Sequence, residues 1–451
     1  MSEALPETGE QNQMRNARIR RAAGAATVCA VAACAIAATN QARASGFELR
    51  EGSTDWMANA FAGDTAKAYD AATVWSNPAG MSRLTQSEID GSVNGIFPTI
   101  NFSGANYVGA AATTPGTTGG NLIQSAATAG FYGVWNVTPE FKLGLGADAP
   151  FGQRVTNPGD FVGRYQSLVS SITDEAFTLS ASYKINEQWS VGGGPVIDTF
   201  NARLTQAINT GPLAALGDPV GDLHGSSVGF GYNLGVLFQP TPDLRFGADY
   251  RSRIQHDISG TQSTFVPPAL GAFAPGVGAL LATQNFPAST KVTLPDSVTA
   301  GVYWQATPQL ALLGDISWTD WSLLQTINIT PASPLGAPTT INENWRNTYA
   351  VSVGANYLLT RQLMLQGGFG FDQSPVTNTY RTSRIPDSNR YILGIGAQYE
   401  ILANVTVQVA YAHVFFDSAP VSTQANATSG ILSGTYSNAA NTASLGVRVR
   451  F

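Results

Sequence analysis

Alternation between apolar residues and small or polar residues governs the stretch from 344 to 372. One set of alternate residues is largely apolar: Trp345, Asn347, Tyr349, Val351, Val353, Ala355 and Tyr357. The residues between them are Arg346, Thr348, Ala350, Ser352, Gly354 and Asn356, and after a polar break at 359–362 the alternation resumes as far as Asp372. Successive side chains of a strand point to opposite faces. The pattern therefore predicts a β-hairpin with one apolar face, on which Trp345 is expected to lie.

The opposite face of this hairpin is rich in Gly, Ser, Asn and Arg, which would make a poor dry core. An apolar face toward lipid and a polar face toward a lumen are typical of a transmembrane β-barrel. The chain is 12% charged, about half the usual ~25%, and contains 47 glycines. A net charge of -6 gives no basic surface for nucleic acid, so we expect no nucleic-acid partner.

About fourteen strands can be traced along the chain, an even number as expected for a bacterial barrel. They cover 87–103, 128–138, 140–150, 174–186, 187–204, 225–239, 242–260, 291–306, 308–324, 344–359, 361–373, 389–401, 404–416 and 441–451. Short polar breaks, such as Thr307-Pro308, alternate with long connections, such as 151–173 and 261–290. Short turns at one end and long loops at the other distinguish the periplasmic and extracellular ends of a barrel. The predicted fold is an all-β, multi-pass antiparallel barrel occupying 87–451.

Residues 1–44 have the features of a secretory signal peptide. Four arginines between 15 and 21 precede an alanine-rich apolar run from 22 to 38, and Ala42-Arg43-Ala44 offers small residues for cleavage. A membrane anchor helix and lipid attachment at Cys34 are the alternatives, but the run is short against the ~20 residues of a span. Both cysteines lie in this segment, so the remainder has no thiol chemistry.

Residues 45–86 do not alternate and are expected to form a small helical plug inside the barrel. The apolar side chains of this segment are enough to pack against a wall but too few for an independent core: Phe47, Trp56, Met57, Phe61 and Trp75. Asn77-Pro78-Ala79-Gly80 predicts a closing turn, because proline fixes its own φ and disfavours helix in the residue before it. The alternative is an arm lying outside the barrel on the periplasmic side.

Several short motifs resemble those of the FadL family of outer-membrane transporters for long-chain fatty acids and other hydrophobic compounds. In chain order they are Ser45-Gly46-Phe47, Asn77-Pro78-Ala79, Pro150-Phe151-Gly152, Gly163-Arg164-Tyr165-Gln166, Leu294-Pro295-Asp296-Ser297, Trp318-Thr319-Asp320-Trp321-Ser322, Asn344-Trp345-Arg346-Asn347-Thr348-Tyr349, Asp372-Gln373-Ser374-Pro375-Val376 and Ile385-Pro386-Asp387-Ser388-Asn389-Arg390. The resemblance covers essentially all of the chain after residue 44.

The resemblance implies a monomeric barrel closed by a plug and residing in the bacterial outer membrane, in contact with its lipid. It implies capture in an extracellular apolar groove, transfer to an internal pocket reached by Phe47, and sideways release through a gap beside a kinked strand. Gly46, Phe47, Asn77, Pro78 and Ala79 are then the expected plug and gating residues. Gly144, Gly146 and Pro150 permit a kink, although an ordinary strand end at Pro150 is the simpler alternative. The terminal Phe451 resembles the signal read by the barrel-assembly machinery.

Two long loops carry many apolar residues for segments that face water. We interpret them as a substrate groove, since exposed apolar patches usually mark binding sites. The candidate groove residues are Leu213, Leu216, Phe265, Leu270, Phe273, Leu280, Leu281 and Phe286. The alternative is that the loops merely pack on each other.

A fatty acid needs a partner for its carboxylate, because burying an unpaired charge is costly. Arginine suits that role through a two-pronged hydrogen bond. Arg203 and Arg346 are placed by alternation on inward faces near the extracellular ends of their strands, and Arg164 falls in a loop. Ion pairs with Asp or Glu in the wall are the alternative for each of the three.

No catalytic, metal-binding or cofactor motif is evident, so the chain is not expected to be an enzyme. His224, His256 and His413 lie in different predicted strands or loops and lack metal-ligand spacing. The leading hypothesis is passive transport of a hydrophobic small molecule. A diffusion porin for polar solutes and an outer-membrane lipid hydrolase are the alternatives.

Overall fold

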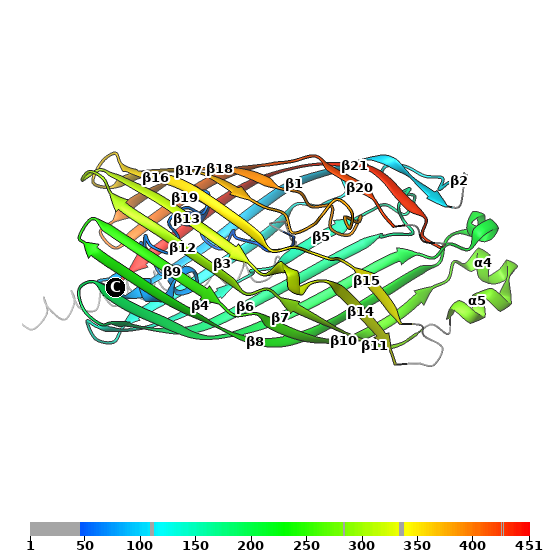
Figure 1. Ribbon diagram of the computed structural model, residues 1–451, viewed down its shortest axis with the longest axis horizontal. Helices are drawn as coiled ribbons and strands as arrows, with labels where there is room; N and C mark the ends of the chain where they lie inside the picture. Colours follow the sequence, from blue (N-terminus) through cyan, green and yellow to red (C-terminus); the bar gives the residue numbers. More distant parts are fainter. Residues whose placement is uncertain (1–45, 109–111, 283–284, 333–337, 425, 427) are drawn as a thin grey trace, which may run out of the picture.

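The computed structural model describes residues 46–451 apart from 109–111, 283–284, 333–337, 425 and 427, so the expected signal peptide lies outside the described residues. These residues form a closed antiparallel barrel of fourteen strands, several of them divided into two segments (Figure 1). The predicted fold class is confirmed. Around the wall the segments are β1 (Glu88–Val108), β3 (Ala126–Asn136), β4 (Phe141–Asp148) with β5 (Gly152–Thr156), β6 (Val169–Lys184), β7 (Trp189–Ala207), β8 (Val220–Thr241), β9 (Leu244–Arg251) with β10 (Ile254–Phe265), β11 (Phe286–Leu294) with β12 (Ser297–Gln305), β13 (Leu310–Thr319) with β14 (Thr326–Pro331), β15 (Thr339–Asn342) with β16 (Thr348–Leu358), β17 (Leu363–Asp372), β18 (Arg390–Leu402), β19 (Val405–Phe416) with β20 (Ala419–Ser422), and β21 (Ile431–Arg450).

Each strand pairs with its neighbours in sequence, and the last strand closes the barrel on the first. The β1–β21 ladder runs from Glu88↔Arg450 to Tyr107↔Ile431. The short β2 (Ala112–Thr113) extends β1 beyond the wall. Closure pairs the first strand with the last, which a barrel in lipid requires because no water is there to satisfy backbone groups.

The connections alternate in length as the sequence predicts. The tight turns, including 306–309 and 403–404, gather at the end that carries the C-terminus (Figure 1). The long connections gather at the other end, where the helices α4 (Pro268–Phe273) and α5 (Pro275–Ala282) project. By the rule for bacterial barrels, these are the periplasmic and extracellular ends.

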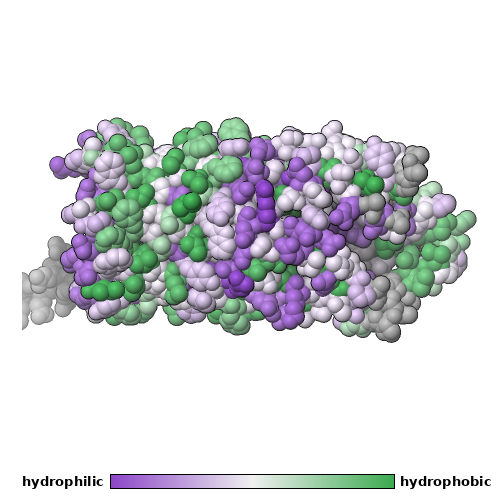
Figure 2. Space-filling model, in the orientation of Figure 1, coloured by the Kyte–Doolittle hydropathy of each residue, from purple (hydrophilic) through white to green (hydrophobic). Residues whose placement is uncertain are grey.

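An apolar outer face and a polar inner face follow the predicted alternation. Val353 on β16 is 57% exposed, whereas Ser352 and Asn356 on the same strand are buried inside. In Figure 2 apolar residues cover much of the half nearer the short turns, and a hydrophilic band crosses the barrel beyond them. Among the described residues, no helix has the length and hydrophobicity needed to cross a bilayer.

Trp345 is the exception to the predicted hairpin face. β16 begins only at Thr348, and the chain before it is irregular, with Asn344 in the left-handed region at φ 44°. Trp345 therefore leaves the outward row and is buried inside the barrel, with 2% of its surface exposed. The expectation that it faces lipid was wrong, because the alternation does not extend past the start of the strand.

Residues 46–86 fill the interior near the short-turn end (Figure 1). They contain α2 (Thr54–Ala58), α3 (Thr73–Ser76) and the 3-10 helix η1 (Pro78–Arg83). The side chain of Ser53 accepts a hydrogen bond from Asp55 N and so caps α2. Helix α2 packs on β18, β19 and β21, and η1 packs on β6, β7 and β8. This internal segment is called the plug below.

The plug approaches the wall most closely where the inward wall residue is glycine. A Cβ atom at Gly130, Gly247 or Gly368 would overlap a backbone carbonyl of the plug, namely that of Gly52, Thr65 or Asn59. Close backbone approach is one of the structural reasons for glycine in a strand. The plug is therefore seated against bare backbone rather than against side chains at these places.

A buried ion-pair network holds the plug together. Lys67 Nζ lies 2.7 Å from Asp55 Oδ2 and 2.8 Å from Asp64 Oδ1. Asp55 Oδ1 also accepts hydrogen bonds from Gln366 and Gln398 of the wall, at 2.7 Å each. Burial alone would lower the pKa of Lys67, but the attraction of Asp55 and Asp64 raises that pKa above its ordinary value. Lys67 therefore stays charged, and its partner Asp55 joins the plug to β17 and β18.

Candidate functional site

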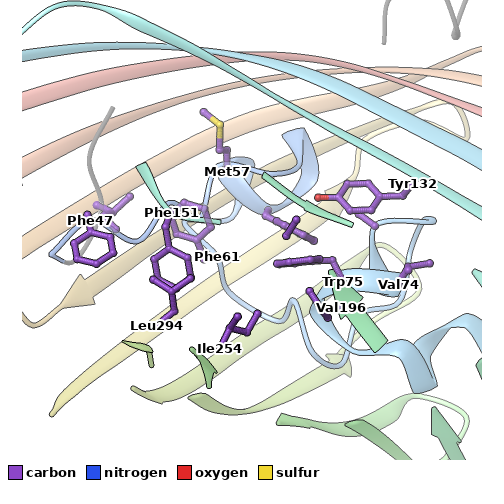
Figure 3. Close-up of a cluster of buried hydrophobic side chains, with 14 of the residues drawn as sticks. Phe47, Met57, Phe61, Val74, Trp75, Tyr132, Phe151, Val196, Ile254 and Leu294 are labelled. Carbon is purple, nitrogen blue, oxygen red and sulfur yellow. The ribbon is translucent and has the colours of Figure 1, made fainter. Parts of the chain in front are cut away.

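Four aromatic side chains from distant parts of the chain meet in the middle of the barrel. Phe47 lies near the start of the plug, Phe151 lies between β4 and β5, Trp321 begins the 3-10 helix η3 (Trp321–Leu323), and Trp345 precedes β16. The Phe47 ring centroid lies 5.7 Å from that of Phe151, 5.0 Å from that of Trp321 and 5.6 Å from that of Trp345. Figure 3 shows the side chains of Phe47 and Phe151 side by side. These four residues are called the aromatic layer.

Backbone contacts fix the position of Phe47 in this layer. Gly46 has φ 63° and its N–H donates to Asp387 Oδ2 at 3.0 Å. Asp387 is itself held by Arg390 at 2.7 Å and by Ser374 at 2.6 Å. Gly152 N donates to Phe47 O and Leu49 N donates to Pro150 O, at 2.7 Å each. The start of the plug is thus anchored on both sides of Phe47.

An apolar pocket opens against one side of the aromatic layer. It contains about 660 Å³ of empty space, part of which is open to solvent, and Phe47 forms part of its lining. Most of its remaining lining is aliphatic or aromatic and comes from β6, β7, β8, β10, β11 and β14: Ile172, Phe200, Leu204, Leu223, Ile258, Val292, Ile327 and Ile329. A concave apolar space of this kind is the usual form of a small-molecule site.

A second pocket lies between the plug and the wall, and its lining is mainly polar. Phe151 lines this pocket together with Glu48, Arg50, Asp64 and Arg251. Since Phe47 lines the apolar pocket and its ring lies 5.7 Å from that of Phe151, the aromatic layer separates the two spaces. Burial raises the pKa of the Glu48 carboxyl group to about 7.

The wall hydrogen bonding is interrupted beside the plug. β3 and β4 pair only between Phe131↔Ala147 and Asn136↔Lys142. Beyond that point β3 keeps its partners on β1, while β5 pairs with β6. Within the described part of the chain, no ladder joins Ala126–Gly130 to residues 149–156. Strand β4 therefore does not simply end at Pro150: the strand breaks at 149–151 and resumes as β5.

Plug residues 47–52 lie against this interruption. Glu48 forms a β-bridge with Phe151, and the Gly52 carbonyl lies against Gly130 of β3. Leu49 is buried with Ile96 of β1 and Ala126 of β3. The segment from 47 to 52 therefore pairs with the break at 149–151 and covers the inner face of β3.

The other predicted plug residues are Asn77, Pro78 and Ala79, which come about thirty residues after Phe47 and pack against β7 and β8 of the wall. The Asn77 side chain accepts from Ala79 N at 3.1 Å and donates to Thr65 O at 2.7 Å and Val236 O at 3.0 Å. This turn packs on Gly192 and Gly235, where a Cβ atom would collide with it. The geometry gives these residues an anchoring position.

The predicted groove residues are divided between exposed and buried positions. Phe265, Leu280 and Phe273 are strongly exposed, and Phe273 has 70% of its surface accessible. Leu270 and Phe286 are buried, and Leu213, Leu216 and Leu281 are half-buried. The 3-10 helix η2 (Gly211–Leu216) contacts α4, so the two loops do lie together. The exposed members form an apolar patch at the extracellular tip, which Figure 2 shows at one end of the molecule.

The three candidate arginines lie away from the apolar pocket. Arg203 lies on the outward face of β7 with Val191 and Ile197, so the prediction that it faces inward was wrong. Its guanidinium forms an ion pair with Asp222 at 2.6 Å. Arg164 is buried and engaged by Asp218 at 2.7 Å. Arg346 precedes β16, is exposed, and donates to Ser374 O at 3.3 Å, so it does not lie on an inward strand face.

Arg50 is a cationic side chain that the sequence reasoning missed. Its guanidinium lies over the Phe61 ring, 4.7 Å from the centroid, and lines the polar pocket. Its backbone N–H donates to Glu51 Oε2 at 3.0 Å, but within the described residues its guanidinium forms no hydrogen bond or ion pair, unlike those of Arg164 and Arg203. Its position three residues after Phe47, the last residue of the Ser45-Gly46-Phe47 motif, was the available signal.

The fold and the site define a plugged β-barrel of the bacterial outer membrane. The chain belongs to the outer membrane protein transport protein family (OMPP1/FadL/TodX), whose sequence model matches residues 35–451. The predicted family and the outer-membrane location are thereby confirmed.

Relatives and solved structures agree with this assignment. The chain is 28% identical over 388 residues to a 47 kDa outer membrane protein of Pasteurella multocida, covering 83% of this chain and 88% of the relative. It is 25% identical over 419 residues to the long-chain fatty acid transport protein of Escherichia coli K12, covering 86% and 92%. The crystal structure of a Pseudomonas aeruginosa FadL homologue superposes with TM-score 0.84 at 22% identity, covering 90% of this chain and 100% of that one. The Pseudomonas putida toluene transporter TodX gives TM-score 0.64 at 16% identity, covering 90% and 100%.

Proposed function

We propose that this protein carries hydrophobic small molecules, such as long-chain fatty acids or hydrocarbons, passively across the outer membrane. The observation that carries the proposal is the apolar pocket closed on one side by Phe47 of the plug. Relatives named for the transport of long-chain fatty acids and of toluene support this substrate class.

The apolar patch at the extracellular tip is the proposed capture surface. Phe265, Phe273 and Leu280 are exposed there, next to the half-buried Leu213 and Leu216 of the neighbouring loop. When a ligand covers this surface, the removal of apolar area from water stabilises the complex by roughly 25 cal/mol per Å² buried. A molecule captured there would then pass to the apolar pocket below.

The proposed exit lies beside β3. Because the plug segment 47–52 covers the gap between β3 and β5 from inside, its displacement would open this gap between the lumen and the membrane. Displacing Phe47 also opens the aromatic layer between the two pockets. One movement of the plug would therefore release the substrate and open the wall.

The head group of an acidic substrate would meet Arg50 in the polar pocket. Within the described residues the Arg50 guanidinium forms no direct ion pair, although it attracts the nearby Glu48 carboxyl group, whereas Arg164 and Arg203 are paired directly with aspartates. Arg346 remains a candidate for a contact earlier in the path, since it is exposed near the loops. A charge-assisted hydrogen bond to a carboxylate is stronger than one between neutral groups.

Uptake of labelled oleate by cells that lack their own fatty-acid transporter tests the proposal. The described chain has no cysteine, so the double variant Leu49→Cys with Ala126→Cys can lock the plug segment to β3. We expect oxidation to abolish uptake and reduction to restore it, while each single variant is unaffected. Undiminished uptake by the oxidised double variant would exclude release through this gap.

A diffusion porin and a lipid hydrolase give different results. A porin would show a large, steady ion current in planar bilayers, which the filled lumen argues against. A hydrolase would release fatty acid from a lipid ester with purified protein. Mass spectrometry of lipids extracted from the purified protein would identify the substrate class directly.

A further inference from the structure

Two aspartates and a histidine from three wall strands meet on the inner face of the barrel. Asp174 lies on β6, Asp198 on β7 and His256 on β10, and one ligand atom from each falls within 4.8 Å of the others. His256 Nε2 is 3.2 Å from Asp198 Oδ1. All three residues are fully buried, with at most 1% of their surface exposed.

Strand register and one glycine bring these residues together. Asp198 pairs with Ala176 of β6, which places it diagonally next to Asp174, and on its other side it pairs with Gly229 of β8. β8 separates β7 from β10, so His256 must reach across Gly229 to meet Asp198. A Cβ atom on Gly229 would lie 2.7 Å from His256 Cε1, closer than real contacts allow. Only glycine leaves room for the imidazole there.

The ladder between β8 and β10 is interrupted at this level. Its pairs run from Ser226↔Ser259 to Val220↔Phe265, and β8 pairs with β9 only from Asn233 onward. The Phe200 ring covers the imidazole, with centroids 5.1 Å apart. The cluster thus lies where the wall has lost backbone hydrogen bonds, beside the apolar pocket that Phe200 lines.

Five of the six polar side-chain atoms of the cluster are unsatisfied within the described residues. Both carboxylate oxygens of Asp174, Oδ1 of Asp198 and both ring nitrogens of His256 lack a hydrogen bond of acceptable geometry. No described lysine or arginine forms an ion pair with either aspartate. Buried carboxylates without compensation are costly, and proteins usually pair them or use them to coordinate a metal.

We propose that Asp174, Asp198 and His256 form a binding site for a divalent transition-metal ion of the zinc class. Two carboxylates and an imidazole are a donor set that suits Zn²⁺, whereas Ca²⁺ takes six to eight oxygen ligands. Ligand atoms about 2.0–2.1 Å from a tetrahedral ion lie roughly 3.3 Å apart. The 3.2 Å separation of His256 Nε2 and Asp198 Oδ1 matches this spacing. Asp174 would complete the set by a small side-chain movement.

A bound ion would neutralise the two carboxylates and connect β6, β7 and β10. It would therefore act as a clamp where the β8–β10 ladder is missing. This site is independent of the transport proposal, since neither the plug nor the exit beside β3 contributes a ligand.

The test uses the full barrel in detergent, stripped with EDTA and dialysed against Zn²⁺ or Co²⁺. We expect about one ion per barrel by elemental mass spectrometry, and a visible Co²⁺ absorption band. His256→Phe and Asp174→Asn should each weaken Zn²⁺ binding at least tenfold. Gly229→Ala should do the same while leaving all three ligands in the sequence, because it displaces the imidazole.

His413→Phe is the matched control. His413 lies on β19, outside the cluster, and its Nδ1 is hydrogen-bonded to Asn441 Oδ1 at 2.8 Å. A shift in gel mobility between heated and unheated samples verifies that each variant is a folded barrel. If His256→Phe does not fold, the nearly isosteric Asp174→Asn variant decides the test. Less than a tenth of an ion per wild-type barrel would overturn the proposal. So would undiminished binding by the folded Asp174→Asn variant.

Discussion

Gly46 lies so close to Trp345 that a Cβ atom on Gly46 would come within 2.6 Å of Trp345 Cζ3. Gly46 also has φ 63°, a conformation that costs other residues roughly 1–2 kcal/mol. The first plug residue of the described chain is therefore restricted both by its backbone and by the aromatic layer.

Gly46→Ala should loosen the start of the plug. The strain and the collision with Trp345 favour detachment of residues 46–52, so hydrogen exchange of this segment should accelerate by about tenfold or more, as expected for ~1.4 kcal/mol. Gly276→Ala in α5 is the control, since nothing lies near its Cβ position. Equal protection of the segment in both variants would contradict the proposed restriction.

Lys67→Met should destabilise the plug strongly. It leaves Asp55 and Asp64 buried without their cation, and breaking a buried pair in this way costs about 3–5 kcal/mol. Planar-bilayer recordings should show added conductance as the plug loosens. Lys184→Met, which removes a pair to the exposed Glu187, should change stability by less than about 1 kcal/mol and leave the conductance unchanged.

Phe273→Asp should weaken capture without affecting folding. Phe273 is 70% exposed at the extracellular tip, so the barrel loses no packing while the apolar patch gains a charge. Uptake at low substrate concentration should fall several-fold and recover at saturation. Gln309→Asp, in a turn at the opposite end, is the matched surface charge, and it should leave uptake unaltered at every concentration.

Docking of the plug segment should weaken as pH rises. Burial raises the pKa of Glu48 from its ordinary 4.5 to about 7. The protonated form is favoured in the docked state, so this contribution is fully present below about pH 4.5 and is lost as pH rises through 7. Hydrogen exchange of residues 46–52, corrected for intrinsic rates, should show this loss of protection between pH 5 and 8. Glu48→Gln should reduce the pH dependence of this protection, to which Glu51 also contributes because burial raises the pKa of its carboxyl group, and an unchanged profile would refute the role of Glu48.

The strand pattern and the turns could be predicted because both are local properties. Period-two alternation and polar breaks such as Thr307-Pro308 depend only on neighbouring residues. Trp345 and Arg203 were misplaced because the alternation was extended beyond the point where tertiary contacts or strand phase set the orientation. The cluster of Asp174, Asp198 and His256 could not be predicted, since it depends on register across β8 and on Gly229.

The family resemblance implied an internal pocket reached by Phe47, but the lining of the two pockets could not be derived from the sequence for a related reason. Phe47 and Trp321 appeared in motifs, but their contact joins segments separated by most of the chain. Arg50 was overlooked because its significance depends on having no carboxylate partner, which only the folded arrangement reveals.

The contacts of plug carbonyls with Gly130, Gly247 and Gly368, called the glycine seats, have a consequence for chimeras of related barrels. Each seat matches one carbonyl of this particular plug, so plug and cylinder are fitted as a pair. A chimera that grafts a foreign plug into this cylinder should assemble only when the incoming backbone follows the same path, whatever side chains it carries.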